Sequence, residues 1–213
     1  MKTDQLIDML STNVEPVRSG QFRRILAWVL IGGGVAAFCV MLTTVGLRTE
    51  PAGVSQLSFL GLKLLFTLSL VGIGAMWLER LMRPGGKTQK LVALTVLPFL
   101  VVGIAGGVAL TVERPMTWGR MIFGMNWATC LLCIPLFAVV PFALLIWALR
   151  RGAPTDLKRT GAMAGLVAGA LGATAYAFHC PGDSVPFIAV WYGTLVALCA
   201  LVGAMLGPRL LRW

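Results

Sequence analysis

The chain has 213 residues, of which 58% are hydrophobic and only 12% charged, and its formal net charge is +10. Soluble domains have roughly 45–50% apolar and about 25% charged residues, so this composition excludes a soluble enzyme, a nucleic-acid-binding domain and a secreted disulfide scaffold. It is typical of a protein that lies mostly in lipid, and the positive charge of such a protein reports its topology rather than a nucleic-acid partner.

Residues 1–24 precede the first apolar stretch and predict a cytoplasmic tail with a short amphipathic helix. At about 100° per residue, the apolar side chains fall on one side of this helix and the acidic ones on the other. The apolar side consists of Leu6, Ile7, Leu10 and Val14, and the acidic side includes Asp4 and Asp8. A helix of about 12 residues is marginal alone in water, so we expect its apolar side to bind a groove on a partner protein. A tail that stays undocked, or docks on its own chain, is the alternative.

Six apolar stretches follow the tail, and each is near the roughly 20 residues that cross the hydrocarbon core of a bilayer. We predict spans at 25–47, 57–78, 91–112, 127–149, 161–178 and 187–206, followed by a C-terminal tail at 207–213. The loops between them have at most 14 residues and cannot bury a core of their own. The predicted fold class is therefore all-α, a polytopic membrane protein with one bundle of six transmembrane helices over residues 25–206.

The positions of the basic residues predict the orientation of the bundle. Fourteen of the 18 Lys and Arg residues lie in the two tails and alternate loops, three lie in the other loops, and Lys63 lies within a span. Because cytoplasmic loops carry an excess of Lys and Arg, both termini are expected in the cytoplasm. No direct contact with nucleic acid is predicted.

Small residues predict how the helices pack. Gly161, Gly165 and Gly169 recur every four residues along one face of the fifth span, and Gly103 and Gly107 repeat the spacing in the third. Such faces let helix backbones approach closely.

Two cysteines are expected near the non-cytoplasmic end of the bundle. Cys130 is the fourth residue of the fourth span, and Cys180 lies in the loop His179-Cys180-Pro181-Gly182-Asp183-Ser184. If they are adjacent, they could form a disulfide or share a soft metal ion, with His179 as a further ligand. Two unrelated thiols and an ordinary interfacial histidine are the alternatives, and no cofactor is predicted.

Two further residues leave other functions open. Cys133 completes a Cys-x-x-Cys with Cys130, which raises the alternative of a membrane thiol–disulfide oxidoreductase that uses Cys130, Cys133 and Cys180 with a quinone acceptor. Lys63, six residues inside the second span, is either a functional ionisable group or a side chain that snorkels to water, and snorkelling is the expected outcome. Because no other ionisable group lies in a span, a transporter is a weaker alternative. No motif marks a catalytic centre, so a non-enzyme is predicted.

Three segments together resemble the NrsF family of bacterial membrane-embedded anti-sigma factors. They are Met1-Lys2-Thr3-Asp4-Gln5-Leu6-Ile7, Leu149-Arg150-Arg151-Gly152-Ala153-Pro154-Thr155, and the 179–184 loop followed by Trp191-Tyr192. The resemblance implies that the N-terminal segment holds an extracytoplasmic-function sigma factor. It also implies that two outer cysteines, matching Cys130 and Cys180, are needed for a stress response. The resulting hypothesis is that a periplasmic oxidant or thiol-binding metal acts at these cysteines and weakens the binding of the tail to the sigma factor.

Overall fold

The computed structural model describes residues 21–48, 54–82, 89–124, 127–152, 154 and 156–212. The sigma-binding residues predicted in the tail, Asp4, Leu6, Ile7, Asp8, Leu10 and Val14, lie outside these ranges. Their predicted contacts therefore remain predictions.

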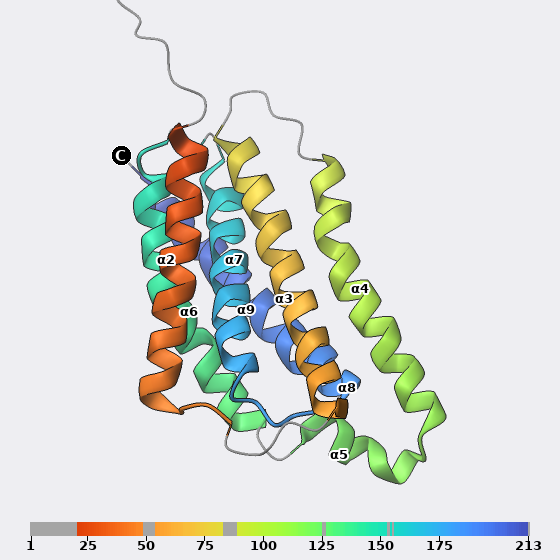
Figure 1. Cartoon of the computed structure of the whole chain (residues 1–213). Coiled ribbons are helices and arrows are strands. Elements are labelled where there is room, and N and C mark those ends of the chain that lie inside the picture. The colour runs from red at the N-terminus through yellow and green to blue at the C-terminus, as the bar shows by residue number, and fades with distance from the viewer. Residues whose placement is uncertain are drawn as a thin grey trace, which may run out of the picture.

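The described residues form helices and no strands (Figure 1). The long helices are α2 (Gln21–Thr44), α3 (Val54–Leu81), α4 (Gln89–Val112), α6 (Trp127–Leu149), α7 (Leu157–Ala177) and α9 (Gly193–Leu210). The short elements are η1 (Pro115–Thr117), α5 (Trp118–Phe123), α8 (Val185–Phe187) and η2 (Ile188–Tyr192), a single π-helical turn.

The structure confirms an all-helical fold with six segments long and apolar enough to cross a membrane. Four of them coincide with one long helix each, within a few residues of the predicted bounds. The fourth segment along the chain runs from η1 and α5 to the end of α6, and α6 itself has the predicted bounds 127–149. The sixth runs from α8 through η2 into α9, so the predicted stretch 187–206 is interrupted by a π-helical turn near its start.

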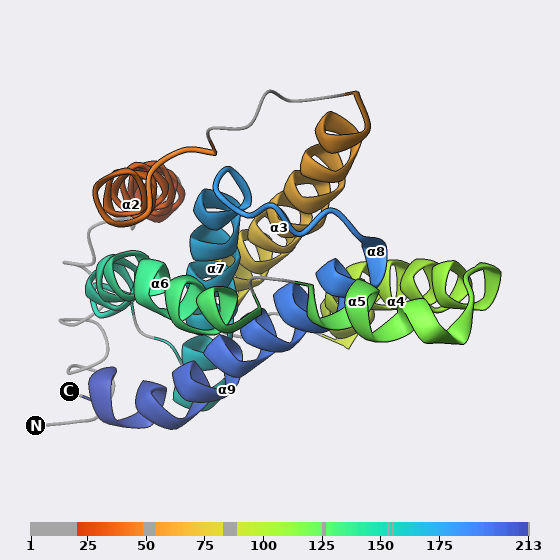
Figure 2. The same cartoon turned by 90° about the horizontal axis from the view of Figure 1, so that it is seen from below.

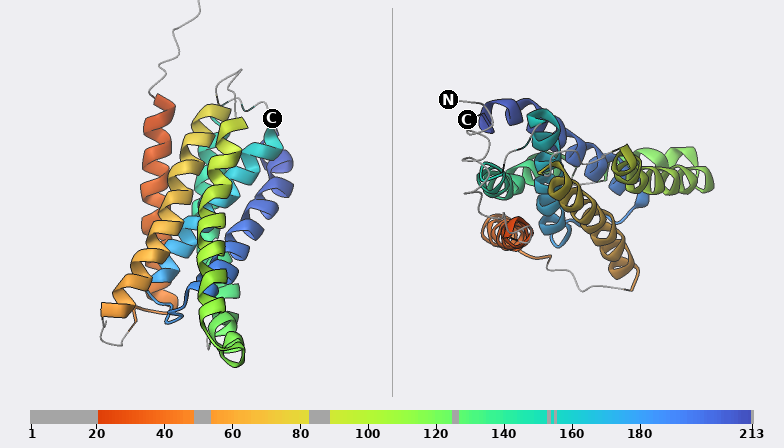
Figure 3. Two further views of the ribbon diagram at one scale, coloured as in Figure 1. Left: turned by 90° about the vertical axis from the view of Figure 1, so that its right-hand side faces the viewer. Right: turned by 90° about the horizontal axis from the view of Figure 1, so that it is seen from above.

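Helix α7 occupies the centre of the bundle, with α2, α3, α6 and α9 around it (Figures 2 and 3). It has the lowest mean hydropathy of the six segments, yet 89% of its most apolar stretch is buried. The two facts have one cause, since a helix enclosed by protein needs small residues for close packing more than large apolar ones for contact with lipid. Its moderate hydropathy therefore reflects its central position.

The predicted glycine face of α7 packs directly against α9. A Cβ atom added at Gly161 or Gly165 would overlap the backbone of α9 at Gly203, Gly207 or Cys199. One turn further along, a Cβ at Gly169 would lie 2.7 Å from the Cβ of Cys199. The packing predicted for the fifth span is confirmed, and its partner is the sixth.

The corresponding prediction for the third span is wrong. No atom lies within 4 Å of a Cβ added at Gly103 or Gly107, which face open space on α4. Gly106 is the glycine of this helix that packs closely, against Pro186 and Ala189. Helix α4 lies at the edge of the bundle (Figure 3), beside α3, α8 and η2, so most of its surface has no helix to approach.

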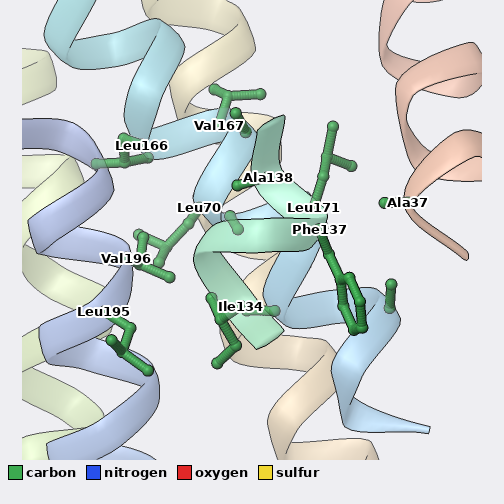
Figure 4. Close-up of a cluster of buried hydrophobic side chains, with 14 of the residues drawn as sticks. Ala37, Leu70, Ile134, Phe137, Ala138, Leu166, Val167, Leu171, Leu195 and Val196 are labelled. Atoms are coloured by element: carbon green, nitrogen blue, oxygen red, sulfur yellow. The ribbon is translucent and has the colours of Figure 1, made fainter. Parts of the chain in front are cut away.

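Buried apolar side chains from five helices form a common core (Figure 4). The labelled residues are Ala37 from α2, Leu70 from α3, Ile134, Phe137 and Ala138 from α6, Leu166, Val167 and Leu171 from α7, and Leu195 and Val196 from α9. This core holds α6 and α7 together, and these helices carry the two cysteines toward the same end of the bundle.

The described chain begins and ends at one end of the bundle, where α2 starts and α9 finishes (Figure 1). The 178–184 loop, which contains Cys180, lies at the opposite end, beside the last turn of α2 and the first turns of α3 and α6. We call this the cysteine end.

Candidate functional site

The structure brings Cys130 and Cys180 together. Their sulfur atoms are 3.9 Å apart, and the two side chains are 0% and 1% exposed. At this separation the two free thiols share a hydrogen bond in which either sulfur could be the donor, and a movement of about 2 Å would bring the sulfurs to the bonding distance of a disulfide. Of the alternatives left open by the sequence, adjacency is confirmed.

Local structure explains why these two residues meet. Cys130 lies in the first turn of α6, which begins at Trp127. Helix α7 ends at Ala177, and the backbone N–H of Cys180 donates to the carbonyl oxygen of Tyr176 at 3.0 Å, which folds the chain back over the helix end. Pro181 follows immediately and cannot continue a helix.

Two tyrosines enclose the thiol pair. Tyr176 of α7 and Tyr192 of η2 are fully buried, with ring centroids 6.4 Å apart. Neither hydroxyl has a hydrogen-bond partner among the described residues. Buried hydroxyls are normally paired, and π-helical turns such as η2 occur often at functional sites.

Lys63 also belongs to this site, and the prediction that it snorkels to water is wrong. Its side chain reaches the 178–184 loop near the start of α3, but it is 1% exposed. The Nζ atom donates to the carbonyl oxygen of Cys180 at 3.0 Å and lies 3.4 Å from the Oδ1 atom of Asp183. The protein itself supplies the polar partners that water would otherwise provide.

Asp183 joins two cations across the cysteine end. Besides Lys63 on α3, its carboxylate binds Arg48, which follows α2, with an Nη1–Oδ2 distance of 3.0 Å. A buried ammonium costs several kcal/mol unless it is paired and hydrogen-bonded. The carboxylate of Asp183 therefore offsets the burial of Lys63 while it links α2, α3 and the loop.

The surroundings of Cys180 favour its thiolate. The hydrogen bond from the thiol of Cys130 lowers the pKa of Cys180, burial opposes this, and the positive charge of Lys63 lowers it further, to about 6. A thiolate is the nucleophilic form of cysteine.

Further hydrogen bonds attach the 178–184 loop to its neighbours. The Nδ1 atom of His179 lies 3.0 Å from the carbonyl oxygen of Gly46, and the backbone N–H of Arg48 donates to the carbonyl oxygen of Phe178 at 3.4 Å. On the other side, the Ser184 hydroxyl donates to the carbonyl oxygen of Met121 at 2.7 Å. A displacement of the loop would therefore strain its hydrogen bonds to α5 and to the residues that follow α2.

The remaining candidates take other positions. His179 uses Nδ1 toward Gly46, and the described residues contain no group of three or more His, Cys, Asp or Glu side chains that could hold a metal ion. Cys133 is buried one turn further into α6, and the sulfur contact of Cys130 is with Cys180. Cys39 is exposed on the surface of α2.

Sequence reasoning missed the roles of Asp183, Arg48 and the two tyrosines. A signal for the first was present, because a lysine inside a span requires a partner and Asp183 is the acid of the short loop that carries Cys180. Nothing in the sequence indicated that Tyr192 would face the cysteines, since this depends on the π-helical turn.

Comparison with known proteins relates the whole chain to one group of regulators. Residues 10–213 match the model of a family described as "NrsF: Negative regulator of sigma F". The chain is 32% identical over its full length to a probable anti-sigma-F factor NrsF from Azospira oryzae, and 32% identical over 214 aligned positions to the anti-sigma-F factor NrsF of Caulobacter vibrioides. Each alignment covers 100% of both proteins. No solved structure matches the chain significantly.

Proposed function

The chain belongs to the NrsF family of negative regulators of sigma F, and from this premise we propose that it is a membrane-embedded anti-sigma factor. Its cytoplasmic tail sequesters an extracytoplasmic-function sigma factor through Leu6, Ile7, Leu10 and Val14, with Asp4 and Asp8 on the opposite face. The excess of Lys and Arg at both termini and in alternate loops supports a cytoplasmic tail and an inner-membrane bundle.

The release signal acts on the thiol pair at the cysteine end, on the non-cytoplasmic side. The observation that carries this proposal is the 3.9 Å contact between the buried sulfurs of Cys130 and Cys180. Oxidation removes two electrons and two protons from the two thiols and joins their sulfurs. A thiol-binding metal is the other inducer that this pair could sense, through coordination by both sulfurs.

The hydrogen bonds of the loop provide a route from the thiols to the tail. When Cys180 moves toward Cys130, the loop pulls on Gly46 and Arg48, which follow α2. Helix α2 begins at Gln21, seven residues after Val14, the last of the proposed sigma-binding residues. To change the sigma factor from mostly bound to mostly free, the oxidised state must bind it about 10⁴-fold more weakly.

Co-purification from membranes tests the docking of the tail. Replacing Leu6 and Leu10 with Asp places two charges on the apolar side of the helix, so the sigma factor is expected to be lost from the purified complex. The matched control replaces Gln5 and Thr12 with Asp, which places the same two charges on the opposite side of the helix and should retain the sigma factor. Unchanged co-purification of the Leu6→Asp, Leu10→Asp variant would reject this docking face.

Induction in cells tests the thiol pair separately. Cys130→Ser and Cys180→Ser variants should keep the sigma factor bound when an oxidant is added, whereas Cys39→Ser, an exposed cysteine of α2, should respond like the unmodified chain. A normal response from both of the first two variants would remove these cysteines from the mechanism.

A further inference from the structure

The cysteine end contains a small polar cavity that reaches one of the two thiols. Its volume is about 140 Å³, which exceeds the space needed for several water molecules, and it lies between the end of α2, the start of α3 and the 178–184 loop. Its lining includes Arg48, Leu60, Lys63, Cys180 and Asp183, and not Cys130. A small polar reagent in this cavity would therefore meet Cys180 before Cys130.

We propose that this cavity admits a hydroperoxide, that Cys180 is the sulfur it oxidises first, and that Lys63 is the positioning residue for this step. The inference rests on the proposed function of the thiol pair and adds the entry route, the order of reaction and the class of oxidant. Cys130, which is fully buried behind Cys180, then acts as the resolving thiol.

Lys63 fixes the reacting residue through its main chain. Its Nζ atom donates to the carbonyl oxygen of Cys180 at 3.0 Å, and this bond holds the loop against the wall of the cavity. The ammonium also places a positive charge beside the thiolate and near the oxygen that leaves the peroxide. Such a charge stabilises both anions in a site from which bulk water is largely excluded.

The reaction balances with the groups in place. The Cys180 thiolate attacks one oxygen of the hydroperoxide, the O–O bond breaks, and the second oxygen leaves as hydroxide or alkoxide and takes up a proton. The product is a sulfenic acid on Cys180. The sulfur of Cys130 then attacks that of Cys180, the S–O bond breaks, and the hydroxyl leaves as water with the proton of the Cys130 thiol. Two thiols lose two electrons, and the peroxide gains them.

Charged and titratable groups around Cys180 come from several elements, and Arg120 of α5 lies beside the same loop across a second cavity. The groups around Cys180 are Arg48 after α2, Lys63 on α3, Cys130 on α6, Tyr176 on α7, Tyr192 on η2 and Asp183 in the same loop. Asp183 neutralises one of the two cations, so one positive charge remains. The orphaned hydroxyl of Tyr192 is a further group that could donate to a thiolate when one forms.

Oxidation of the reduced full-length protein in bilayer nanodiscs, with hydrogen peroxide as the probe and dimedone as the trap for sulfenic acid, tests the order. In the Cys130→Ser variant, mass spectrometry should find dimedone on Cys180. In the Cys180→Ser variant, Cys130 should remain unlabelled. Dimedone on Cys130 in the second variant at the rate seen for Cys180 in the first would overturn the order.

The role of Lys63 is tested by rate and by pH profile, in the Cys130→Ser background. Lys63→Met should slow the labelling of Cys180 at least tenfold at pH 7 and move the midpoint of its pH profile upward, because the thiolate loses a stabilising charge. Lys63→Arg should keep the rate within about threefold. The control Lys158→Met removes an exposed lysine from the other end of α7 and should change nothing. A purely structural role predicts a loosened loop and faster labelling in Lys63→Met, and that outcome, or an unchanged rate, overturns the proposal.

The entry route is tested without altering any charge. Leu60→Trp fills the cavity and should slow oxidation of Cys180, whereas Leu65→Trp, at an exposed position of the same helix, should not. Equal rates for both would reject the route.

The assays contain no sigma factor, so the two proposals can fail separately. If oxidised protein retains the sigma factor while the peroxide chemistry holds, the proposed function fails alone. If it releases the sigma factor while Lys63→Met oxidises normally, the inference fails alone.

Discussion

Asp183 forms ion pairs with two basic side chains at the cysteine end, Arg48 and Lys63. Its two carboxylate oxygens bind different cations, one on α3 and one after α2. Because Lys63 is almost fully buried, its charge depends on this partner and on the carbonyl oxygen of Cys180. The stability of the site is therefore sensitive to the loss of one negative charge.

We expect Asp183→Asn to destabilise the protein by about 3 kcal/mol, because removing one partner of a buried pair leaves the other charge uncompensated. The free energy of unfolding in mixed micelles measures this effect. Glu113→Gln, at an exposed position after α4, is the matched control and should change it by less than about 0.5 kcal/mol. Equal stabilities for the two variants would show that Lys63 does not rely on Asp183.

At the scale of the helices, the pair α7 and α9 depends on glycine more than on large apolar side chains. Three glycines of α7 face the backbone or Cβ atoms of α9. On α9, Gly203 and Gly207 face the backbone of α7. In lipid, helices associate through close packing because the apolar environment supplies no hydrophobic driving force. A side chain at these positions would separate two helices that meet along much of their length.

Gly165→Val should therefore lower the free energy of unfolding by about 3 kcal/mol, since its Cβ atom would overlap the backbone of Cys199 and Gly203 and overpacking forces the backbone to shift. Gly103→Val makes the same change on α4, where a Cβ meets open space, and should have little effect. Denaturation of both purified variants in increasing SDS provides the comparison. A loss of stability in Gly103→Val as large as in Gly165→Val would contradict the packing described for α4.

At the scale of the whole molecule, the even number of long helices places both ends of the described chain at one end of the bundle (Figure 1). The thiol site lies at the opposite end, and α2 runs from it to the residue that follows the tail. The proposed function uses this arrangement, with the signal received at the cysteine end and the sigma factor held at the other end.

Labelling of intact cells with a membrane-impermeant maleimide tests this orientation. In a chain without its native cysteines, Met116→Cys at the cysteine end should be labelled from outside the inner membrane. Lys158→Cys at the other end should be labelled only after the membrane is opened. Both positions are exposed, so a difference reports sidedness rather than burial. The reverse pattern would place the thiol site in the cytoplasm and reject the proposed mechanism.

The sequence by itself determined the number of long apolar helices, their approximate bounds and the glycine face of α7, because hydrophobic length and small-residue spacing are local properties of the chain. It also placed Cys130 and Cys180 near one end of the bundle, because α6 begins and α7 ends there. It did not indicate the short elements η1, α5, α8 and η2. Only the tertiary structure decided that the two sulfurs touch, that Gly103 and Gly107 have no partner, and that Lys63 turns to Asp183 instead of water. Each of these outcomes depends on which helices are neighbours, and neighbour choice arises from contacts between residues far apart in the chain.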